Sequence, residues 1–549
     1  MLLNFAAYIA LLSPIIFIAT AVVSWFQPGM NPTLVKRMSI VSSSIAVLVA
    51  LFSGLAVIEH GVLQTGLLGI NELGLSFRLD ALSVIMFGMI ALLSYVIMKF
   101  SFNYLDGDTR HGAFLGRLSA CIASVQLLVM SGNLAVLWLA WVLTSISLHR
   151  LLIFYFDRPV AIVAARKKFI LARLGDFLLL IAIALLYAQF GTGQLEQIFN
   201  SIALGNTGGI EVVAILIALV AILKSAQFPT HGWLIEVMET PTPVSALLHA
   251  GLLNAGPFLV IRLAFVMEAS TYASYILMII GGCTALFGSV VYLTQTSVKT
   301  ALAYSSIAHM GFSLLTCGLG VFSAAMLHLV AHSFYKAHAF LSSGSIIDVL
   351  KSAKVAIKRP IVKSKHVVVG ILMSVAVYIG FAMLLGIHLY KELSLLAVGL
   401  VLVMGLSRIF TMAMVGVSKQ VFMKAMALVV VVAGSFFLLE SGASYLLASQ
   451  VPVVAYPSLG KIIVISLILV AFGAAIYLQI MAPGIPRHAY YRSLAIHVKN
   501  GFYINAHFDS LINASKIHSP EYRKVIQSQI KKLEELEYMR SERLEQQPI

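Results

Sequence analysis

Apolar runs of about 20 residues follow one another along this chain from its first residues to beyond residue 480. An α-helix needs a run of that length to cross the hydrocarbon core of a membrane, because each residue adds only about 1.5 Å. Of the 549 residues, 60% are hydrophobic and 11% are charged, whereas roughly a quarter are charged in soluble domains. The sequence therefore predicts an all-α, polytopic membrane protein with about fifteen transmembrane helices.

The composition also excludes other classes of protein. Strands of a β-barrel alternate apolar and polar residues over about ten positions, and no such alternation dominates here. The formal net charge of +15 does not indicate nucleic-acid binding, because Lys and Arg lie in short connections and near the C-terminal end, where they set membrane topology. Cys121, Cys283 and Cys317 lie singly in apolar segments, which favours neither a disulfide framework nor a zinc site.

The basic connections predict the orientation of the helices. Connections with several Lys and Arg follow the first, fifth, eleventh and fifteenth spans, whereas those after the sixth, eighth, tenth and fourteenth have none. Because cytoplasmic loops carry the excess of Lys and Arg, we expect the N-terminus outside and the C-terminus in the cytoplasm. The spans are expected at residues 4–26, 38–58, 79–99, 112–130, 133–155, 169–190, 210–228, 244–267, 273–294, 299–319, 322–346, 366–387, 391–415, 419–440 and 459–483.

The segment from Ile210 to Glu239 is about 30 residues long, which exceeds one simple span. It is interrupted at Gln227-Phe228-Pro229, so we expect a broken helix. Irregular backbone at membrane depth is tolerated only inside protein or beside a wet cavity, and broken helices in transporters often mark the transport site. A proline kink of purely structural use is the alternative.

Ionisable side chains within the predicted spans are candidates for an ion path, because such groups usually face one another or an aqueous passage. His328, His332 and Lys336 are spaced four residues apart and share one helix face, along which a proton could pass. A metal bound by His328 and His332 is the less favoured alternative, since no HExxH glutamate or thiolate accompanies them. Further ionisable residues of these spans are Arg173, Asp176, Lys224, His249, Arg262, Lys299, His309 and His338.

Lys224 is the most informative of these residues, because it stands just before the predicted break. Burial disfavours a charged ammonium group, and an approaching carboxylate favours it again. A lysine in this place could therefore load and release protons.

The sequence becomes polar and charged after residue 488. Ser519, Pro520 and Glu521 form a favourable helix start. The apolar residues that follow recur at roughly helical spacing: Tyr522, Ile526, Ile530, Leu533, Leu536 and Met539. We expect a cytoplasmic amphipathic helix that contacts either a partner or the membrane surface.

Several runs in the middle of the chain form a specific pattern: Lys224 to Pro229 (KSAQFP), Trp233, Glu239, Pro241 to His249, Thr294 to Lys299, Ala303 to Ser305, and His328 to Ser345. The pattern resembles the proton-translocating antiporter-like subunits of respiratory complex I and of Mrp antiporters. The resemblance is clear over roughly residues 75–350. It implies two inverted five-helix repeats, a broken helix in each repeat, and a polar axis through the membrane centre.

The resemblance also implies roles for individual residues. Lys224 would be the central lysine, His249 and Lys299 would be connecting groups, and the row from His328 to Lys336 would belong to the second half-channel. The implied parts of the chain are N-terminal transmembrane helices at 1–111, a first repeat at 112–267, a second repeat at 268–415, C-terminal transmembrane helices at 416–488, and a cytoplasmic amphipathic tail at 489–549.

Two departures from the family pattern concern charged groups. The family usually places a glutamate after the tryptophan of helix 5, as the partner of the central lysine, but Val142 follows Trp141 here. Asp176 is the favoured substitute for this glutamate. The alternative is that Asp176 only forms an ion pair with Arg173. Glu236 and Glu239 are further candidate carboxylates in this half. The helix-12 region lacks a clear lysine at a break, and the candidates to stand in are Lys391 and Arg408.

These departures, together with the runs from Asp157 to Phe169 and from His249 to Gly256, look like one branch of the family, the DabB membrane subunits of inorganic-carbon accumulation systems. In that branch the partner is DabA, a zinc protein that resembles β-carbonic anhydrases. The resemblance implies a proton- or cation-translocating subunit of the bacterial inner membrane that energises hydration of carbon dioxide by a cytoplasmic DabA-like partner. Zinc and the catalytic residues are expected in that partner, and no cofactor is expected in this chain.

Two alternatives remain at this point. One is an Mrp-type Na⁺/H⁺ antiporter or a proton-pumping subunit of complex I, against which the absent helix-5 glutamate and the modest length count. The other is a membrane anchor that positions a cytoplasmic enzyme and conducts nothing. The row from His328 to Lys336 and the KSAQFP break argue against the anchor.

Overall fold

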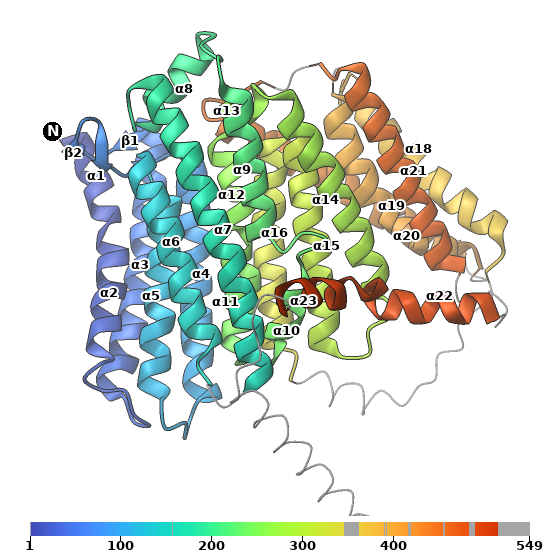
Figure 1. Cartoon of the computed structure of the whole chain (residues 1–549). Coiled ribbons are helices and arrows are strands. Elements are labelled where there is room, and N and C mark those ends of the chain that lie inside the picture. The colour runs from blue at the N-terminus through green and yellow to red at the C-terminus, as the bar shows by residue number, and fades with distance from the viewer. Residues whose placement is uncertain are drawn as a thin grey trace, which may run out of the picture.

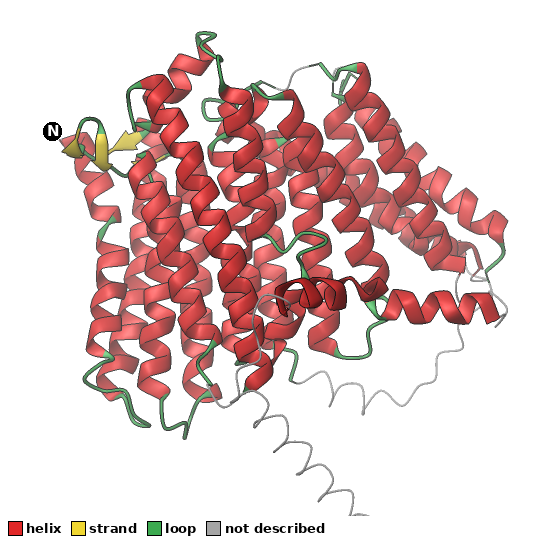
Figure 2. Cartoon of the chain, in the orientation of Figure 1, coloured by secondary structure: helices red, strands yellow, loops and turns green. Residues whose placement is uncertain are grey.

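The computed structural model describes residues 2–155, 158–344, 362–388, 390, 392–415, 419–453, 456–481 and 489–513. Most of its helices run side by side in one wide bundle (Figures 1 and 2). Within the described residues, twelve helices are long and apolar enough to cross a membrane. The predicted all-α, polytopic membrane fold is therefore confirmed.

The helices and strands are, in chain order, α1 (Leu2–Ala10), α2 (Leu12–Val23), α3 (Thr33–His60), β1 (Leu63–Gln64), β2 (Leu68–Ile70), β3 (Leu73–Leu75), β4 (Arg78–Leu79), α4 (Ala81–Tyr104), α5 (His111–Val129), α6 (Leu134–Leu152), α7 (Pro159–Phe190), α8 (Leu195–Ala203), α9 (Ile210–Lys224), α10 (Gly232–Glu236), η1 (Val237–Glu239), α11 (Thr242–Ala250), η2 (Leu252–Asn254), α12 (Ala255–Arg262), α13 (Ala264–Glu268), α14 (Thr271–Tyr292), α15 (Val298–Gly318), α16 (Phe322–Leu341), α18 (Ser364–Leu384), α19 (Leu393–Val415), α20 (Lys419–Leu447), α21 (Leu459–Met481), α22 (Ala489–Lys499), η4 (Gly501–Tyr503) and α23 (Ile504–Asn513).

Three further helices, α9, α15 and α16, pack among the twelve (Figure 1). Helix α9 is only 15 residues long, and α15 and α16 carry several polar and ionisable side chains along their length. These three helices lie where spans were expected at 210–228, 299–319 and 322–346. The number of fifteen spans and the inverted repeats stay predictions.

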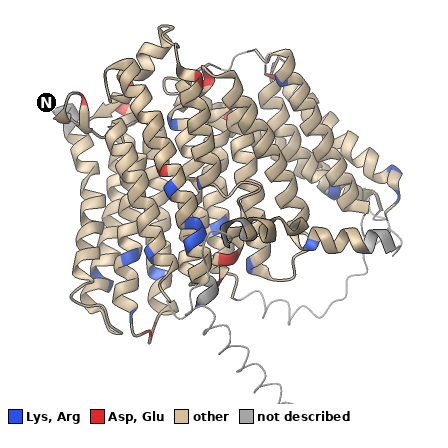
Figure 3. Ribbon diagram, in the orientation of Figure 1, with Lys and Arg blue, Asp and Glu red and all other residues tan. Residues whose placement is uncertain are grey.

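The four short strands lie between α3 and α4 and form two antiparallel pairs, β1 with β4 and β2 with β3. Gly69 and Gly74 face each other across the second pair, where a Cβ on either would come within 2.5 Å of the opposite Cα. Figure 1 places the strands at the upper end of the bundle, with α10, α22 and α23 toward the lower end. We refer to these as the strand end and the α10 end. Much of the Lys and Arg ribbon in Figure 3 lies in the lower part of the bundle.

The predicted break after Lys224 is confirmed, because α9 ends there and α10 begins only at Gly232. A second break was not predicted. The span expected at 244–267 divides into α11, η2, α12 and α13, with Gly251 at φ −125° between α11 and η2. Gly256 lets α12 approach the α9 backbone, since a Cβ there would lie 2.6 Å from the Ala221 carbonyl oxygen.

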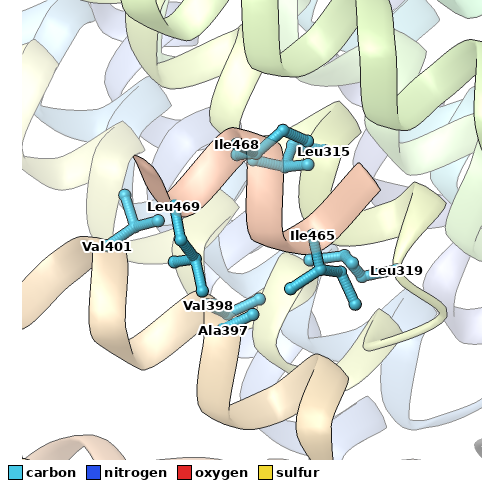
Figure 4. Close-up of a pocket in the computed structure, with 8 residues that line it drawn as sticks. All are labelled: Leu315, Leu319, Ala397, Val398, Val401, Ile465, Ile468 and Leu469. Atoms are coloured by element: carbon cyan, nitrogen blue, oxygen red, sulfur yellow. The ribbon is translucent and has the colours of Figure 1, made fainter. Parts of the chain in front are cut away.

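The broken helix expected in the second repeat does not appear in the described residues. Helices α18 and α19 each run unbroken over 21 and 23 residues. Neither contains a proline, so no backbone N–H is missing from the helical hydrogen bonds. Where α15, α19 and α21 meet, the contact is lined only by apolar side chains (Figure 4), so this contact offers no polar route for an ion.

Helices α22 and α23 lie across the bundle rather than along it (Figure 1). Asn505 Nδ2 on α23 donates a hydrogen bond to Glu236 Oε1 at 2.9 Å, and Gln295 Nε2 donates to the Lys499 carbonyl at 3.0 Å. The first part of the polar C-terminal segment is thereby fixed to the bundle. The amphipathic helix predicted from Ser519 lies outside the described residues.

A buried ion-pair network fixes the strand end. Asp80 caps α4 by accepting a hydrogen bond from the Ser83 backbone N–H at 2.8 Å. Its Oδ2 atom also pairs with Arg78 Nε at 2.9 Å and with Arg262 Nη1 at 2.6 Å. Burial alone would raise the pKa of Asp80, but Arg262 and Arg78 outweigh it and hold that pKa below its ordinary value. The network therefore joins α4, β4 and α12 as charged partners.

Replacing Asp80 by Asn should destabilise the protein, because two buried guanidinium groups would lose their counter-charge. Removing one partner from a buried ion pair costs about 3–5 kcal/mol. We expect a clear drop in the thermal unfolding midpoint of the detergent-solubilised protein, followed by intrinsic fluorescence. The control is Asp106→Asn, whose side chain is 76% exposed. An equal midpoint for the two variants would contradict the structural role of the network.

Candidate functional site

Lys224 ends α9 at the first break, and its ammonium group is held by α6. Its Nζ atom donates hydrogen bonds to Thr144 Oγ1 at 3.0 Å and to Ser145 Oγ at 2.8 Å. It also lies 4.2 Å from the centre of the Trp141 ring, within range of a cation–π attraction. Two hydroxyl groups and an aromatic face thus surround the amine on the helix where the family usually places its glutamate.

Asp176 lies on α7, buried beside Arg173 on the same helix. Its Oδ2 atom is 2.5 Å from Arg173 Nη2, while its backbone carbonyl accepts a hydrogen bond from Trp138 Nε1 at 3.0 Å. The carboxylate also acts electrostatically on Lys224, although the two are not hydrogen-bonded. Both sequence-based interpretations of Asp176 therefore have a physical counterpart, and its role as the substitute carboxylate stays a prediction.

Lys167 and Lys168 lie in the same region. The sequence analysis did not predict that these two lysines are buried in the bundle. The run from Arg166 to Lys168 was assigned to a connection, but α7 begins at Pro159 and carries it into the bundle. Lys168 is buried, and its Nζ atom donates to the Ser145 carbonyl at 3.1 Å. The signal was available in the helix-starting proline after Arg158.

The other two carboxylates proposed for this half have different surroundings. Glu236 accepts two hydrogen bonds from the Lys167 ammonium group, at 2.7 and 2.8 Å, and is therefore engaged away from Lys224. The Glu239 side chain is exposed, and its backbone carbonyl accepts a hydrogen bond from Arg158 Nη1 at 2.6 Å. We call the group formed by Thr144, Ser145, Lys168, Arg173, Asp176 and Lys224 the lysine cluster.

A second group of ionisable side chains lies where α11, α15 and α16 meet. His249 is fully buried on α11 and stacks on Phe340 of α16 at a ring-centre distance of 4.4 Å. His309 of α15 lies between the two histidines of α16, with ring centres 5.2 Å from His328 and 5.1 Å from His332. Lys336 is fully buried, and its Nζ atom donates to the Leu302 carbonyl at 3.1 Å.

We call these five residues, His249, His309, His328, His332 and Lys336, the histidine cluster. Both ring nitrogens of His249 and His332 are buried without a hydrogen-bond partner among the described residues. Across the same ranges, no group of three or more His, Cys, Asp or Glu side chains is arranged to hold a metal ion. The structure thus brings the predicted row together and adds His309 to it.

A short polar connection links the two clusters. Ser225, which follows Lys224, donates to the Leu253 carbonyl at 3.3 Å. The next residue in η2, Asn254, donates from Nδ2 to Ser333 Oγ at 2.6 Å, and Ser333 follows His332 on α16. The unpredicted break at η2 thus places an amide side chain between the clusters.

The remaining predicted residues lie apart from this connection. Lys299 is partly buried in the first turn of α15, three residues before Leu302. Arg408 is exposed on α19 and therefore does not join either cluster. Lys391 lies outside the described residues.

Comparison with known proteins places these features in a family. A family model described as the NADH:quinone oxidoreductase/Mrp antiporter transmembrane region matches residues 131–422. A second model, described as the N-terminus of chain 5 of NADH-ubiquinone oxidoreductase (complex I), matches residues 68–115. All residues of both clusters lie within the range of the first match.

Curated relatives agree with this placement. The probable inorganic carbon transporter subunit DabB2 of Halothiobacillus neapolitanus is 46% identical over 295 residues, which are 53% of this chain and 54% of the relative. The probable inorganic carbon transporter subunit DabB of Hydrogenovibrio crunogenus is 43% identical over 270 residues, 49% of this chain and 52% of the relative. The chain thus spans about half the length of the curated relatives it matches.

A solved Mrp complex from Dietzia sp. has the same fold, with a TM-score of 0.65 over 92% of this chain and 59% of that chain at 22% identity. The resemblance to complex I and Mrp subunits is confirmed. Since the first family match covers more than half of the sequence, this chain belongs to the NADH:quinone oxidoreductase/Mrp antiporter family of transmembrane subunits.

Proposed function

We propose that this chain is the proton- or cation-translocating membrane subunit of an inorganic-carbon uptake system. In this proposal it passes the free energy of ion entry to a carbonic-anhydrase-like partner that hydrates carbon dioxide to bicarbonate. The observation that carries the proposal is the set of polar contacts between the lysine cluster and the histidine cluster inside the bundle. Similarity to two subunits named as probable inorganic carbon transporters supports the substrate class.

The hydroxyl groups around Lys224 suit a lysine that changes its protonation state. A hydroxyl can accept a hydrogen bond from an ammonium group and can also donate one to a neutral amine. Thr144 and Ser145 can therefore satisfy Lys224 both before and after it loses a proton. Asp176 adds negative charge nearby without a direct bond to the amine, so a shift of Asp176 between Arg173 and Lys224 would change the stability of the charged form.

The histidine cluster suits onward transfer of the proton. A neutral imidazole carries one donor and one acceptor nitrogen, so it can take a proton on one side and give one up on the other. The neighbouring rings of His309, His328 and His332 lie along α15 and α16, and Lys336 continues the row on α16. The partner would sense charge movement through these helices.

We further propose that a zinc-containing, DabA-like partner docks at the α10 end. By their content of Lys and Arg, the sequence between α6 and α7, the sequence between α16 and α18 and the residues after 488 are expected on the cytoplasmic side. Contacts of α23 with Glu236 and Gly232 would bring a docked partner close to the break beside Lys224.

Substitution of Lys224 should separate proton exchange from a fixed positive charge. Lys224→Met removes the charge, whereas Lys224→Arg keeps a charge that cannot be released. We expect both variants to lose ion-driven accumulation of labelled bicarbonate in cells while the complex remains assembled. Lys99→Met, at an exposed lysine of α4, is the control. Normal accumulation with Lys224→Arg would show that Lys224 does not exchange protons, and normal accumulation with both variants would favour the non-conducting anchor.

The two hydroxyl groups that hold Lys224 provide a second test. Thr144→Val with Ser145→Ala removes two acceptors from a charged donor, and such hydrogen bonds contribute about 1.5–3 kcal/mol each. We expect the translocation rate in vesicles, followed with a pH-sensitive dye, to fall at least about tenfold. Ser147→Ala on the same helix is the matched control. An unchanged rate in the double variant would contradict the role of the hydroxyl pair.

Two truncations should test the docking surface. Ending the chain after Asn513 keeps α22 and α23, whereas ending it after Lys499 also removes α23 and its hydrogen bond to Glu236. We expect both truncations to lower the amount of zinc-containing partner that co-purifies with the membrane subunit, and the shorter chain to retain less. Full recovery of the partner by both truncated chains would contradict this role. It would favour the alternative that the C-terminal segment contacts the membrane surface.

A further inference from the structure

Glu440 is a buried carboxyl group on α20, outside both clusters, with a side chain only 4% exposed. Its Oε1 atom accepts hydrogen bonds from Ser323 Oγ at 2.5 Å and from Ser444 Oγ at 3.2 Å. The Ser444 and Ser323 Oγ atoms also lie 3.0 Å apart. These three oxygen-bearing side chains join the last two turns of α20 to the first turn of α16.

The other oxygen of Glu440 is not satisfied. Oε2 is buried and has no hydrogen-bond partner among the described residues. No cationic side chain in those residues forms an ion pair with Glu440 within 4 Å. A buried carboxylate with neither a counter-charge nor a full set of donors is costly, whereas a proton on Oε2 removes the charge.

The groups that face Glu440 come from the helices packed around it. Tyr378 of α18 is fully buried, interacts electrostatically with Glu440, and has a hydroxyl without a partner among the described residues. On α16, His328 lies five residues after Ser323, about 7.5 Å of helix rise. On α19 the charged residue is Arg408, which is exposed. At the start of α4, Asp80 caps the helix and is already paired with two arginines, while the exposed Lys99 lies in the last two turns of α4.

We propose that Glu440 is a proton-binding site that serves the translocation path of this chain, taking up and releasing a proton at Oε2. The inference rests on the proposed ion translocation. Through its hydrogen bond with Ser323, Glu440 contacts the start of α16, the helix that carries His328, His332 and Lys336.

The geometry favours a proton over a metal cation at this position. The carboxylate oxygen and the two hydroxyls are already bonded to one another at 2.5–3.2 Å, so no space remains between them for a cation that each would coordinate. A proton needs only one free carboxyl oxygen, and Oε2 supplies it.

The position of Ser444 places the site near one end of the bundle. Ser444 is exposed and lies in the last turn of α20. Six residues later, Gln450 accepts a hydrogen bond from the Leu82 backbone N–H at the start of α4, which places this end of α20 at the strand end. Glu440 lies one helical turn further from that end than Ser444, in the part of α20 nearer the end opposite α10.

Infrared difference spectroscopy of the purified complex can detect this proton directly. Acidification of the wild-type protein should produce a carbonyl band of a protonated, buried carboxyl group. We expect Glu440→Gln to lose this band and Glu59→Gln, at an exposed acid, to keep it. Ser323→Ala leaves the carboxyl group in place and removes one donor, so it should shift the band. A band that persists in Glu440→Gln, or no shift in Ser323→Ala, would overturn the proposal.

The same variants should be compared for ion translocation in vesicles. We expect Glu440→Gln to translocate at least tenfold more slowly than wild type and Glu59→Gln at the wild-type rate. A normal rate in Glu440→Gln would show that the site does not serve the path. If this chain does not translocate ions, the Lys224 variants should accumulate carbon normally. The infrared band would still show whether Glu440 binds a proton.

Discussion

A polar group inside the hydrocarbon core must find its partner within the protein, and this constraint organises the whole bundle. Each break in a helix releases backbone groups that lipid cannot satisfy. The breaks after Lys224 and at η2 therefore lie side by side between α7, α14 and α16, where Ser225 can reach the Leu253 carbonyl and Asn254 can reach Ser333. Packing between helices thus permits the irregular backbone on which the proposed path depends.

The buried ionisable groups at the strand end and those in the interior are paired in two different ways. At the strand end, Asp80 is fully paired with two arginines and a backbone N–H, an arrangement that holds helices together. In the interior, Lys224 is held by neutral hydroxyls, and His249 and His332 have unpartnered nitrogens. Incomplete pairing costs stability, and in the proposed function these interior groups are the ones that change their protonation state.

Val142 follows Trp141 where the family pattern implies a glutamate, so Lys224 has different partners from those that the pattern implies. A carboxylate in direct contact would favour the charged ammonium strongly, whereas two hydroxyls favour it less and suit the neutral amine as well. Negative charge reaches Lys224 instead from Asp176 on the neighbouring helix, which also pairs with Arg173. Hydrogen bonds thus reach Lys224 from α6, whereas negative charge comes from α7.

The sequence by itself determined the membrane fold, the break at Lys224 and the row from His328 to Lys336, because hydropathy, proline position and helical spacing are local properties of the chain. Only the tertiary structure decided which groups meet. Thr144 and Ser145 lie about 80 residues from Lys224 in sequence, and Ser323 lies 117 residues from Glu440. Such contacts depend on how helices pack, and a hydroxyl or a carboxyl group carries no local signal of the partner that packing brings to it.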